Sequence, residues 1–156
     1  MSAIAELMST EDIFLDLEVP SKSRLLQEIA RHMEAAHGLP RASVFQSLSH
    51  RERLGSTALG AGVAIPHARI GELHRVRGAY ARLRRAIPFA APDGLPVSDV
   101  LVLLVPKQVS AAHFEILAEA TRMFADRRFR QRLSRCEAAR EARQAFADWP
   151  GERPGN

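Results

Sequence analysis

Apolar residues recur at helical spacing in five parts of the chain. The first is residues 21–36, where we expect an amphipathic helix that is ended by Gly38 and Pro40. Its apolar stripe consists of Leu25, Leu26, Ile29, Ala30 and Met33. Further helices are predicted over residues 42–53, 111–125, 127–134 and 137–148. In the helix over 111–125, the residues expected to face inward are Phe114, Leu117, Ala118, Thr121 and either Met123 or Phe124.

Three segments between these helices have patterns typical of strands. Residues 77–84 alternate small or apolar side chains with charged ones, as a half-exposed strand does. The apolar run over 100–105 ends at Pro106 and fits a strand buried on both faces. A short strand is expected over 62–65, closed by Pro66. Helices and strands therefore mix along the chain, and an α/β sandwich is the expected architecture.

Length and composition indicate one globular domain. The chain has 156 residues, of which 46% are hydrophobic, enough to bury a core. We expect a single domain over 1–148 and a flexible tail over 149–156. Cys136 is the sole cysteine, which excludes a disulfide framework or a multi-thiolate zinc site. No apolar run approaches the ~18 residues of a membrane span, and the N-terminus has acids where a signal peptide is basic, so we expect a cytoplasmic protein without membrane insertion.

The positive charge of the chain comes almost wholly from arginine. There are 20 Arg and 2 Lys against 18 acidic residues, which gives a net charge of +4. Residues 1–40 carry seven acids and three bases, whereas the rest carries 11 acids and 19 bases, so a basic face and an anionic or acidic partner are expected. Nucleic acid is not the expected partner, because only 6% of residues are aromatic and no reading helix is recognisable. The eight arginines between 122 and 143 are expected to form a solvated helical face.

The chemically informative stretch covers residues 50–69. Pro66 fixes its own φ and favours an extended conformation for the residue before it, so we expect His67 at a strand end in a constrained pose. Around it lie groups suited to phosphate oxygens: Gly55, Gly60 and Gly62 for close backbone approach, the hydroxyls of Ser56 and Thr57, and the guanidinium groups of Arg51 and Arg69.

These residue types suit a histidine that accepts a phosphoryl group. A neutral imidazole is a competent nucleophile near pH 7, since its unperturbed pKa is about 6.5. Positive charge and aimed donors would then stabilise the transferred group. Nucleotide-binding loops are excluded: no lysine stands between Lys22 and Lys107 for a Gly-Lys-Ser/Thr sequence, and Ile65 stands where a GxGxxG motif needs its last glycine.

We expect no metal site and no cofactor. No two histidines stand four residues apart on a helix with a carboxylate nearby, which is the spacing of zinc proteases. His32, His37, His50 and His74 are expected at the surface.

The segment GSTALGAGVAIPHAR, residues 55–69, resembles the active-site signature of phosphotransferase-system IIA components of the fructose–mannitol type. The glycines, the Ser-Thr pair and the Ile-Pro-His run stand in the family's order and spacing, although Ala58 replaces a frequent glycine. The resemblance covers about residues 8–148 and, with LEVPSKSRLLQEIA, is greatest to the nitrogen-regulatory branch. It implies a mixed, mainly five-stranded sheet flanked by helices on both faces.

The resemblance also implies a role for matching residues. His67 would be phosphorylated through Nε2, and Arg51 would face the phosphoryl group. His113 matches the second active-site histidine, although Phe114 follows it where the family usually has leucine. The implied donor is an HPr-like nitrogen phosphocarrier, itself charged through enzyme I from phosphoenolpyruvate.

Three functions remain open. The first is a phosphotransferase of the phosphocarrier type, which regulates target proteins such as transporters or kinases by phosphorylation-dependent binding. The second is a sugar-specific IIA subunit that passes its phosphoryl group to a IIB domain. The third is a binding module that keeps the fold without the chemistry.

Overall fold

The computed structural model describes residues 2–108 and 110–150. The helices in this part of the chain are α1 (Lys22–His37), α2 (Arg41–Leu54), α3 (Ala111–Ala125), α4 (Arg127–Arg135) and α5 (Ala139–Asp148). Two single turns of 3₁₀ helix precede them, η1 (Ala5–Leu7) and η2 (Thr10–Asp12). The strands are β1 (Ile13–Leu17), β2 (Ala58–Gly60), β3 (Val63–Ala64), β4 (His67–Ile70), β5 (Arg77–Ile87) and β6 (Val97–Pro106).

The strands form one mixed sheet. β5 and β6 pair antiparallel at its centre, and β1 lies parallel to β5 at one edge. On the other side of β6 lie β3 and β4, both parallel to it, and β2 pairs antiparallel with β3. The α/β prediction is confirmed. The described sheet has six strands where mainly five were expected, because the glycine-rich segment adds the very short strands β2 and β3.

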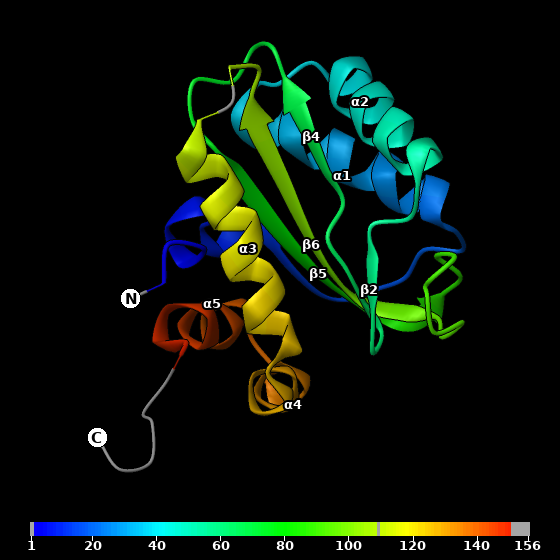
Figure 1. Cartoon of the computed structure of the whole chain (residues 1–156), viewed down its shortest axis with the longest axis vertical. Helices are drawn as coiled ribbons and strands as arrows, with labels where there is room; N and C mark the ends of the chain where they lie inside the picture. Colours follow the sequence, from blue (N-terminus) through cyan, green and yellow to red (C-terminus); the bar gives the residue numbers. More distant parts are fainter. Residues whose placement is uncertain (1, 109, 151–156) are drawn as a thin grey trace.

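Helices cover both faces of the sheet (Figure 1). Side chains of β6 alternate between two separate cores: Val100, Val102 and Leu104 pack with α1 and α2, whereas Leu101 and Leu103 pack with α3, α4 and α5. Both groups are almost completely buried. The prediction of a strand buried on both faces is therefore confirmed.

Helix α3 differs from the expected packing. Phe114, Ala118 and Thr121, all predicted to face inward, are exposed, Phe114 by 64%, while Ala120, Met123 and Phe124 are buried. The C-terminal half of α3 covers the core, whereas its first turn lies beside an open pocket described below. The spacing of apolar residues in the sequence does not show that the core contacts only the C-terminal half of this helix.

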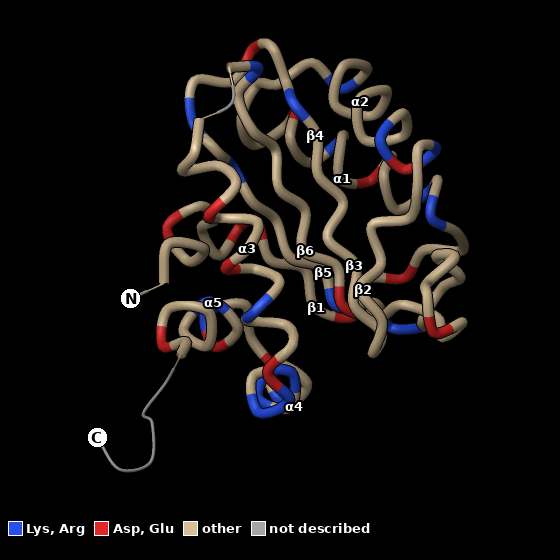
Figure 2. Tube along the Cα trace, in the orientation of Figure 1, with Lys and Arg blue, Asp and Glu red and all other residues tan. Residues whose placement is uncertain are grey.

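Several arginines hold backbone carbonyls rather than face solvent alone. Arg143 on α5 donates to the carbonyl oxygens of Met8 (2.9 Å) and Ala5 (3.1 Å), and Arg130 donates to that of Phe124 (2.7 Å). Figure 2 shows the blue arginine positions gathered around α4. The expected solvated face is thus correct only in part, because tertiary contacts recruit some of these side chains to bind carbonyls at segment ends.

The C-terminal end of the described chain is packed against the domain. Trp149 contacts the core beneath α3–α5, and its Nε1 donates to Asp126 Oδ2 at 3.2 Å. Most of the tail predicted over 149–156 lies outside the described residues. Among the residues that are described, none of the helices has the length and apolar character needed to cross a bilayer.

His32 and His37 are not surface residues, and that expectation is wrong. Both Nε2 atoms lie 2.7 Å from Oδ1 of Asp12, whose side chain is only 2% exposed. Ser9 N–H donates to the other carboxylate oxygen at 3.0 Å. This cluster could not be predicted from the sequence, because η2 and α1 meet only through the tertiary fold.

Replacing Asp12 with asparagine should lower the free energy of unfolding by about 1.5–3 kcal/mol at pH 7, the usual contribution of hydrogen bonds to a charged group. Burial raises the pKa of Asp12, but the hydrogen bonds from His32, Ser9 and His37 outweigh it and hold that pKa well below 3.8. A depressed folded-state pKa stabilises the protein above the unfolded value and loses that effect as the pH falls below about 4. Urea unfolding at pH 7 and pH 3 measures this; a difference between variant and wild type that does not shrink at pH 3 would contradict it.

Candidate functional site

A break in the sheet positions His67. β3 and β4 follow one another along the same side of β6, with Ala64 opposite Val100 and His67 opposite Leu103. Between them Pro66 has no N–H to donate, but its carbonyl accepts from Leu103 N–H at 3.0 Å. The chain therefore leaves the strand pairing at Ile65 and Pro66 and resumes it at His67, the first residue of β4. The sequence predicted a strand closed by Pro66 with His67 at its end, but not the strand β4 that follows.

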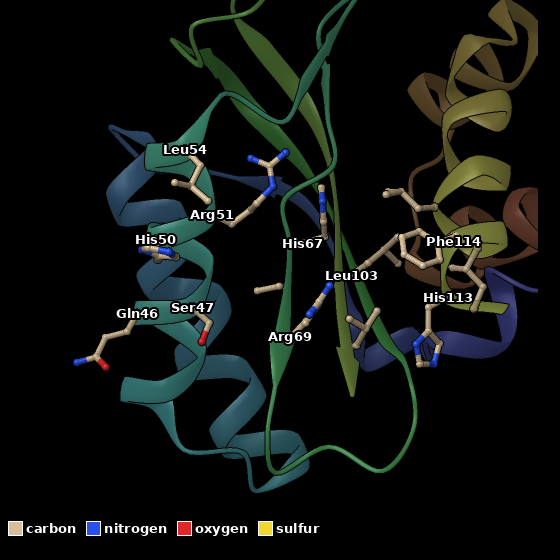
Figure 3. A pocket seen from close by; sticks show the side chains of 14 residues that line it. Gln46, Ser47, His50, Arg51, Leu54, His67, Arg69, Leu103, His113 and Phe114 are labelled. Carbon is tan, nitrogen blue, oxygen red and sulfur yellow. The ribbon is translucent and has the colours of Figure 1, made fainter. Parts of the chain in front are cut away.

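The ring of His67 is fixed through one nitrogen. Its Nδ1 lies 2.8 Å from the backbone carbonyl oxygen of Ile65, which can only accept a hydrogen bond. Nδ1 therefore carries a proton, and in the neutral ring Nε2 keeps its lone pair. Figure 3 shows His67 projecting from β4 into the space between α2 and α3. A nucleophilic nitrogen is thus held at a defined point of a pocket.

That pocket has a volume of about 680 Å³ and lies between α2, the strands β4 and β6, and α3 (Figure 3). Its apolar walls include Leu103, Val105 and Leu117. The polar ring groups and cations lining it are His50, Arg51, His67, Arg69 and His113. In the described part of the chain, no aspartate or glutamate lines it. The pocket therefore suits an anion, and its apolar walls strengthen electrostatic interactions with that anion.

Arg51 stands in the last turn of α2. Its Nη1 donates to the carbonyl oxygen of Gly55 at 2.8 Å, and in Figure 3 its guanidinium group extends from α2 toward the side on which His67 projects. A helix C-terminus carries partial negative charge, which repels an anion. The guanidinium group offsets that charge at the mouth of the pocket and has further N–H groups for oxygen ligands.

His113 lines the same pocket but is turned away from His67 (Figure 3). It is the third residue of a capping box at the start of α3, where its Nδ1 accepts from Ser110 N–H at 3.1 Å. The neutral ring therefore carries its proton on Nε2. Arg69 also lines the pocket, on the exposed side of β4.

Ser56 and Thr57, predicted to bind phosphate, lie outside the set of residues that line the pocket. Ser56 Oγ donates to the carbonyl oxygen of Phe89 at 2.5 Å. The Thr57 hydroxyl donates to buried Glu52, which also pairs with Lys22 Nζ at 3.0 Å. The Ser56 hydroxyl therefore fastens the loop after α2 to the loop before β6, and the Thr57 hydroxyl fastens it to Glu52 on α2, which in turn pairs with Lys22 on α1. Direct contact with phosphate stays a prediction.

The Thr57 hydroxyl should matter for stability. Thr57→Val keeps the shape but leaves a buried carboxylate oxygen of Glu52 without that donor, so we expect the free energy of unfolding to fall by about 1–3 kcal/mol. Thr121→Val is a matched control, because the Thr121 hydroxyl donates to Leu117 O on the exposed side of α3. Thermal unfolding of both variants tests this, and equal small losses would contradict it.

The glycines do not cradle the pocket. Gly60 (φ +98°) and Gly62 (φ +79°) form the tight turn between β2 and β3, with Ala61 between them. The Ala61 N–H donates to Asp93 Oδ2 at 2.8 Å, and this bond, with one from Leu95 N–H, lowers the pKa of Asp93. We expected the backbone of this turn to approach a ligand. Instead, the Ala61 N–H binds the turn to the loop before β6.

The structure adds three residues that sequence reasoning missed. His50, expected as an ordinary surface residue, lines the pocket beside Arg51. Leu54 at the end of α2 is 72% exposed, and Phe114 at the start of α3 is 64% exposed, so apolar side chains stand on opposite rims. Exposed apolar pairs at a pocket mouth are typical of protein-docking sites. In the sequence, only the position of His50 next to Arg51 indicated that one of these three residues lies at the site.

Comparison with known proteins identifies a family and a fold. Residues 6–149 match the family model described as phosphoenolpyruvate-dependent sugar phosphotransferase system, EIIA 2. The chain is 38% identical to a nitrogen regulatory protein of Bradyrhizobium diazoefficiens over 92% of each chain. It superimposes on the nitrogen regulatory protein IIA-Ntr of Neisseria meningitidis with a TM-score of 0.88 and 41% identity, over 93% of this chain and 99% of that one. IIA mannitol of Escherichia coli shares the fold (TM-score 0.75, 17% identity, covering 89% and 98%).

Proposed function

We propose that this chain, which belongs to the EIIA 2 family of the phosphoenolpyruvate-dependent sugar phosphotransferase system, accepts a phosphoryl group on Nε2 of His67 and acts as a regulatory phosphocarrier. Family membership accounts for phosphoryl transfer in general terms. The choice of His67, the donor and the regulatory readout are parts of the proposal.

One observation carries it. The carbonyl of Ile65 holds the Nδ1 proton of His67, so Nε2 enters a pocket lined by arginines and histidines. None of the other five histidines combines a ring fixed through Nδ1–H with this place: His32 and His37 bind Asp12, and His113 accepts at Nδ1. His50 and His74 are exposed.

The reaction follows from that geometry. Nε2 attacks the phosphorus of a phosphohistidine on the donor; a new N–P bond forms, the donor's N–P bond breaks, and the electron pair returns to the donor imidazole. The His67 ring gains positive charge, which the Ile65 carbonyl stabilises through the retained Nδ1–H. Arg51 stabilises the transferred oxygens, because phosphoryl transfer depends mostly on positioning and electrostatics. His113, with its proton on Nε2, lines the same pocket and would act as a second donor to the transferred oxygens once its ring turned toward His67.

A protein donor fits the rim of the pocket. Leu54 and Phe114 offer exposed apolar contact on either side of His67, and Arg51 and Arg69 supply positive charge between them. An HPr-like nitrogen phosphocarrier presenting its phosphohistidine would bury both features. A cytoplasmic location stays a prediction.

The regulatory role is favoured over sugar transport by the relatives. Those at 38% and 41% identity are nitrogen regulatory proteins, whereas the mannitol IIA likeness at 17% concerns the fold alone. Phosphorylation would add roughly −1.5 to −2 charge to a cationic pocket. That change alters which protein surfaces can dock there, and so provides a signal.

The test is a reconstituted transfer. The full chain is incubated with phosphoenolpyruvate, enzyme I and an HPr-like carrier, and intact-mass spectrometry follows the protein. We expect one acid-labile phosphoryl group per chain. No gain would overturn the phosphocarrier function and leave a binding module.

Signalling needs a separate experiment. Binding to candidate targets is compared for unphosphorylated chain, phosphorylated chain and His67→Glu. We expect the phosphorylated chain to differ from the unphosphorylated one by at least about tenfold in affinity for a true target, the size of a modest coupling energy. A phosphoryl group that passes to a IIB domain, with equal target binding in both states, would favour the sugar-specific function.

A further inference from the structure

The three side chains that meet beside η2 have the composition of a metal site. Asp12, His32 and His37 each offer one ligand atom, and these atoms all lie within 4.8 Å of one another. The Nε2 atoms of both histidines converge on the same carboxylate oxygen at 2.7 Å. Their side chains are 2%, 15% and 14% exposed, so the cluster is nearly buried without being closed.

We propose that this cluster binds one divalent transition-metal ion, Zn²⁺ by its ligand chemistry, at a site separate from the phosphoryl pocket. Two imidazoles and one carboxylate are a ligand set suited to Zn²⁺ and its neighbours, whereas Mg²⁺ and Ca²⁺ select oxygen ligands. Three protein ligands leave one position of a tetrahedral ion for water.

The present geometry is close to what coordination needs. Ligand atoms bound at about 2.0–2.1 Å with tetrahedral angles lie about 3.3–3.4 Å apart. Each histidine nitrogen must therefore move away from Asp12 Oδ1 by well under 1 Å from 2.7 Å, and the two nitrogens, which lie within 4.8 Å of one another, must adjust to the same spacing. The second oxygen of Asp12 is held by Ser9 N–H and Oγ, which aims Oδ1 at the histidines. The ring of Phe14 packs edge-on against His32 at 4.8 Å and restricts its rotation.

The protons balance without a co-reactant. In a neutral ring that donates its Nε2 proton to Asp12, that proton moves to Nδ1 through solvent on binding, and Nε2 donates its lone pair to the ion. A doubly protonated ring would release one proton to solvent. Solvent can reach the cluster through a hollow of about 180 Å³ between β1 and α1, which is lined by His32, Phe14 and Ala35.

A bound ion would link two segments at an edge of the sheet. Asp12 directly precedes the edge strand β1, and the two histidines stand on α1. A bound ion would fasten the N-terminal segment to the helix that covers one face of the sheet. The site could not be predicted from the sequence, because His32 and His37 stand five residues apart and only folding brings the Asp12 carboxylate beside them.

The experiment titrates the metal-free full chain with Co²⁺, whose visible absorption reports its coordination, followed by Zn²⁺. We expect one equivalent of Co²⁺ to bind, displaced by Zn²⁺, and Zn²⁺ to raise the melting temperature. His37→Gln should weaken binding by about 100-fold or more, the upper range for losing even an outer partner of a metal site. Its amide can still donate to Asp12, so the fold is expected to persist, as far-UV circular dichroism checks. If His37→Gln does not fold, a second variant, His37→Cys, supplies a smaller zinc ligand. It should bind Co²⁺ and add a thiolate absorption band to the spectrum.

Two controls separate this site from others. His74→Gln removes an exposed histidine, and His67→Gln removes the nucleophile of the phosphoryl pocket; both should bind Co²⁺ as the wild type does. The proposal is overturned by the absence of a Co²⁺ band in the wild type, by unweakened binding in His37→Gln, or by loss of binding in His67→Gln. Because the phosphoryl-transfer assay uses no part of this cluster, its outcome is independent.

Discussion

His67→Gln loses phosphoryl acceptance completely while the fold is retained. Glutamine keeps a hydrogen-bond donor near the Ile65 carbonyl but offers no nucleophilic ring nitrogen, so no N–P bond can form. His67 is only half-buried at the start of β4, so the change removes no core packing. Intact-mass spectrometry after transfer from the HPr-like carrier, with thermal unfolding in parallel, measures both effects.

His50→Gln is the matched control. His50 lines the same pocket from α2 but is exposed and outside the proposed reaction. We expect this variant to accept the phosphoryl group in the same amount as the wild type. Full phosphorylation of His67→Gln, or loss of phosphorylation in His50→Gln alone, would place the acceptor elsewhere.

Arg51→Gln should slow phosphoryl transfer by about 10²–10³-fold, the usual effect of removing one charged or hydrogen-bonding donor aimed at transition-state oxygens. Arg51 also offsets the negative end of α2, which would otherwise repel the incoming group. Its neutral replacement therefore removes attraction and leaves repulsion. Rapid-quench measurements of the rate at saturating donor separate this effect on kcat from weaker docking, which would raise KM instead.

Arg53→Gln is the control for charge alone. Arg53 stands two residues further on in the same last turn of α2, is exposed, and does not line the pocket. We expect its rate constant to change by less than about threefold, since surface charges mainly affect encounter and are screened by salt. Equal slowing by both substitutions would mean that Arg51 acts through net charge and not through a directed contact.

The architecture could be read from periodicity where an element contacts the core along its whole length. The stripe from Leu25 to Met33 is buried as expected, and so is β6 on both faces. Local sequence patterns did not predict features that depend on tertiary contacts. β4 has only four residues and owes its pairing to β6, and the first turn of α3 leaves Phe114 exposed because the core ends beneath it.

In the candidate site too, features set by local backbone geometry could be predicted from the sequence, and features set by tertiary contacts could not. Ile65, Pro66 and His67 act through local backbone geometry, so their sequence spacing predicted the pose of His67. The Ser56 hydroxyl bonds to Phe89, which only the fold brings near, and the Thr57 hydroxyl bonds to Glu52, five residues earlier on α2. Neither residue lines the pocket. Residues of one motif therefore have different roles. His67 presents the nucleophile, whereas Ser56 and Thr57 fasten the loop that follows α2.

The attachment atom gives the sharpest test. ¹⁵N NMR of the chain labelled at histidine nitrogens, recorded after transfer from the HPr-like carrier, distinguishes phosphorylation at Nε2 from phosphorylation at Nδ1. Because the Ile65 carbonyl holds Nδ1–H, we expect a single phosphohistidine at position 67 with the phosphoryl group on Nε2. A phosphoryl group on Nδ1 of His67, or on any other histidine, would contradict the proposed geometry of transfer.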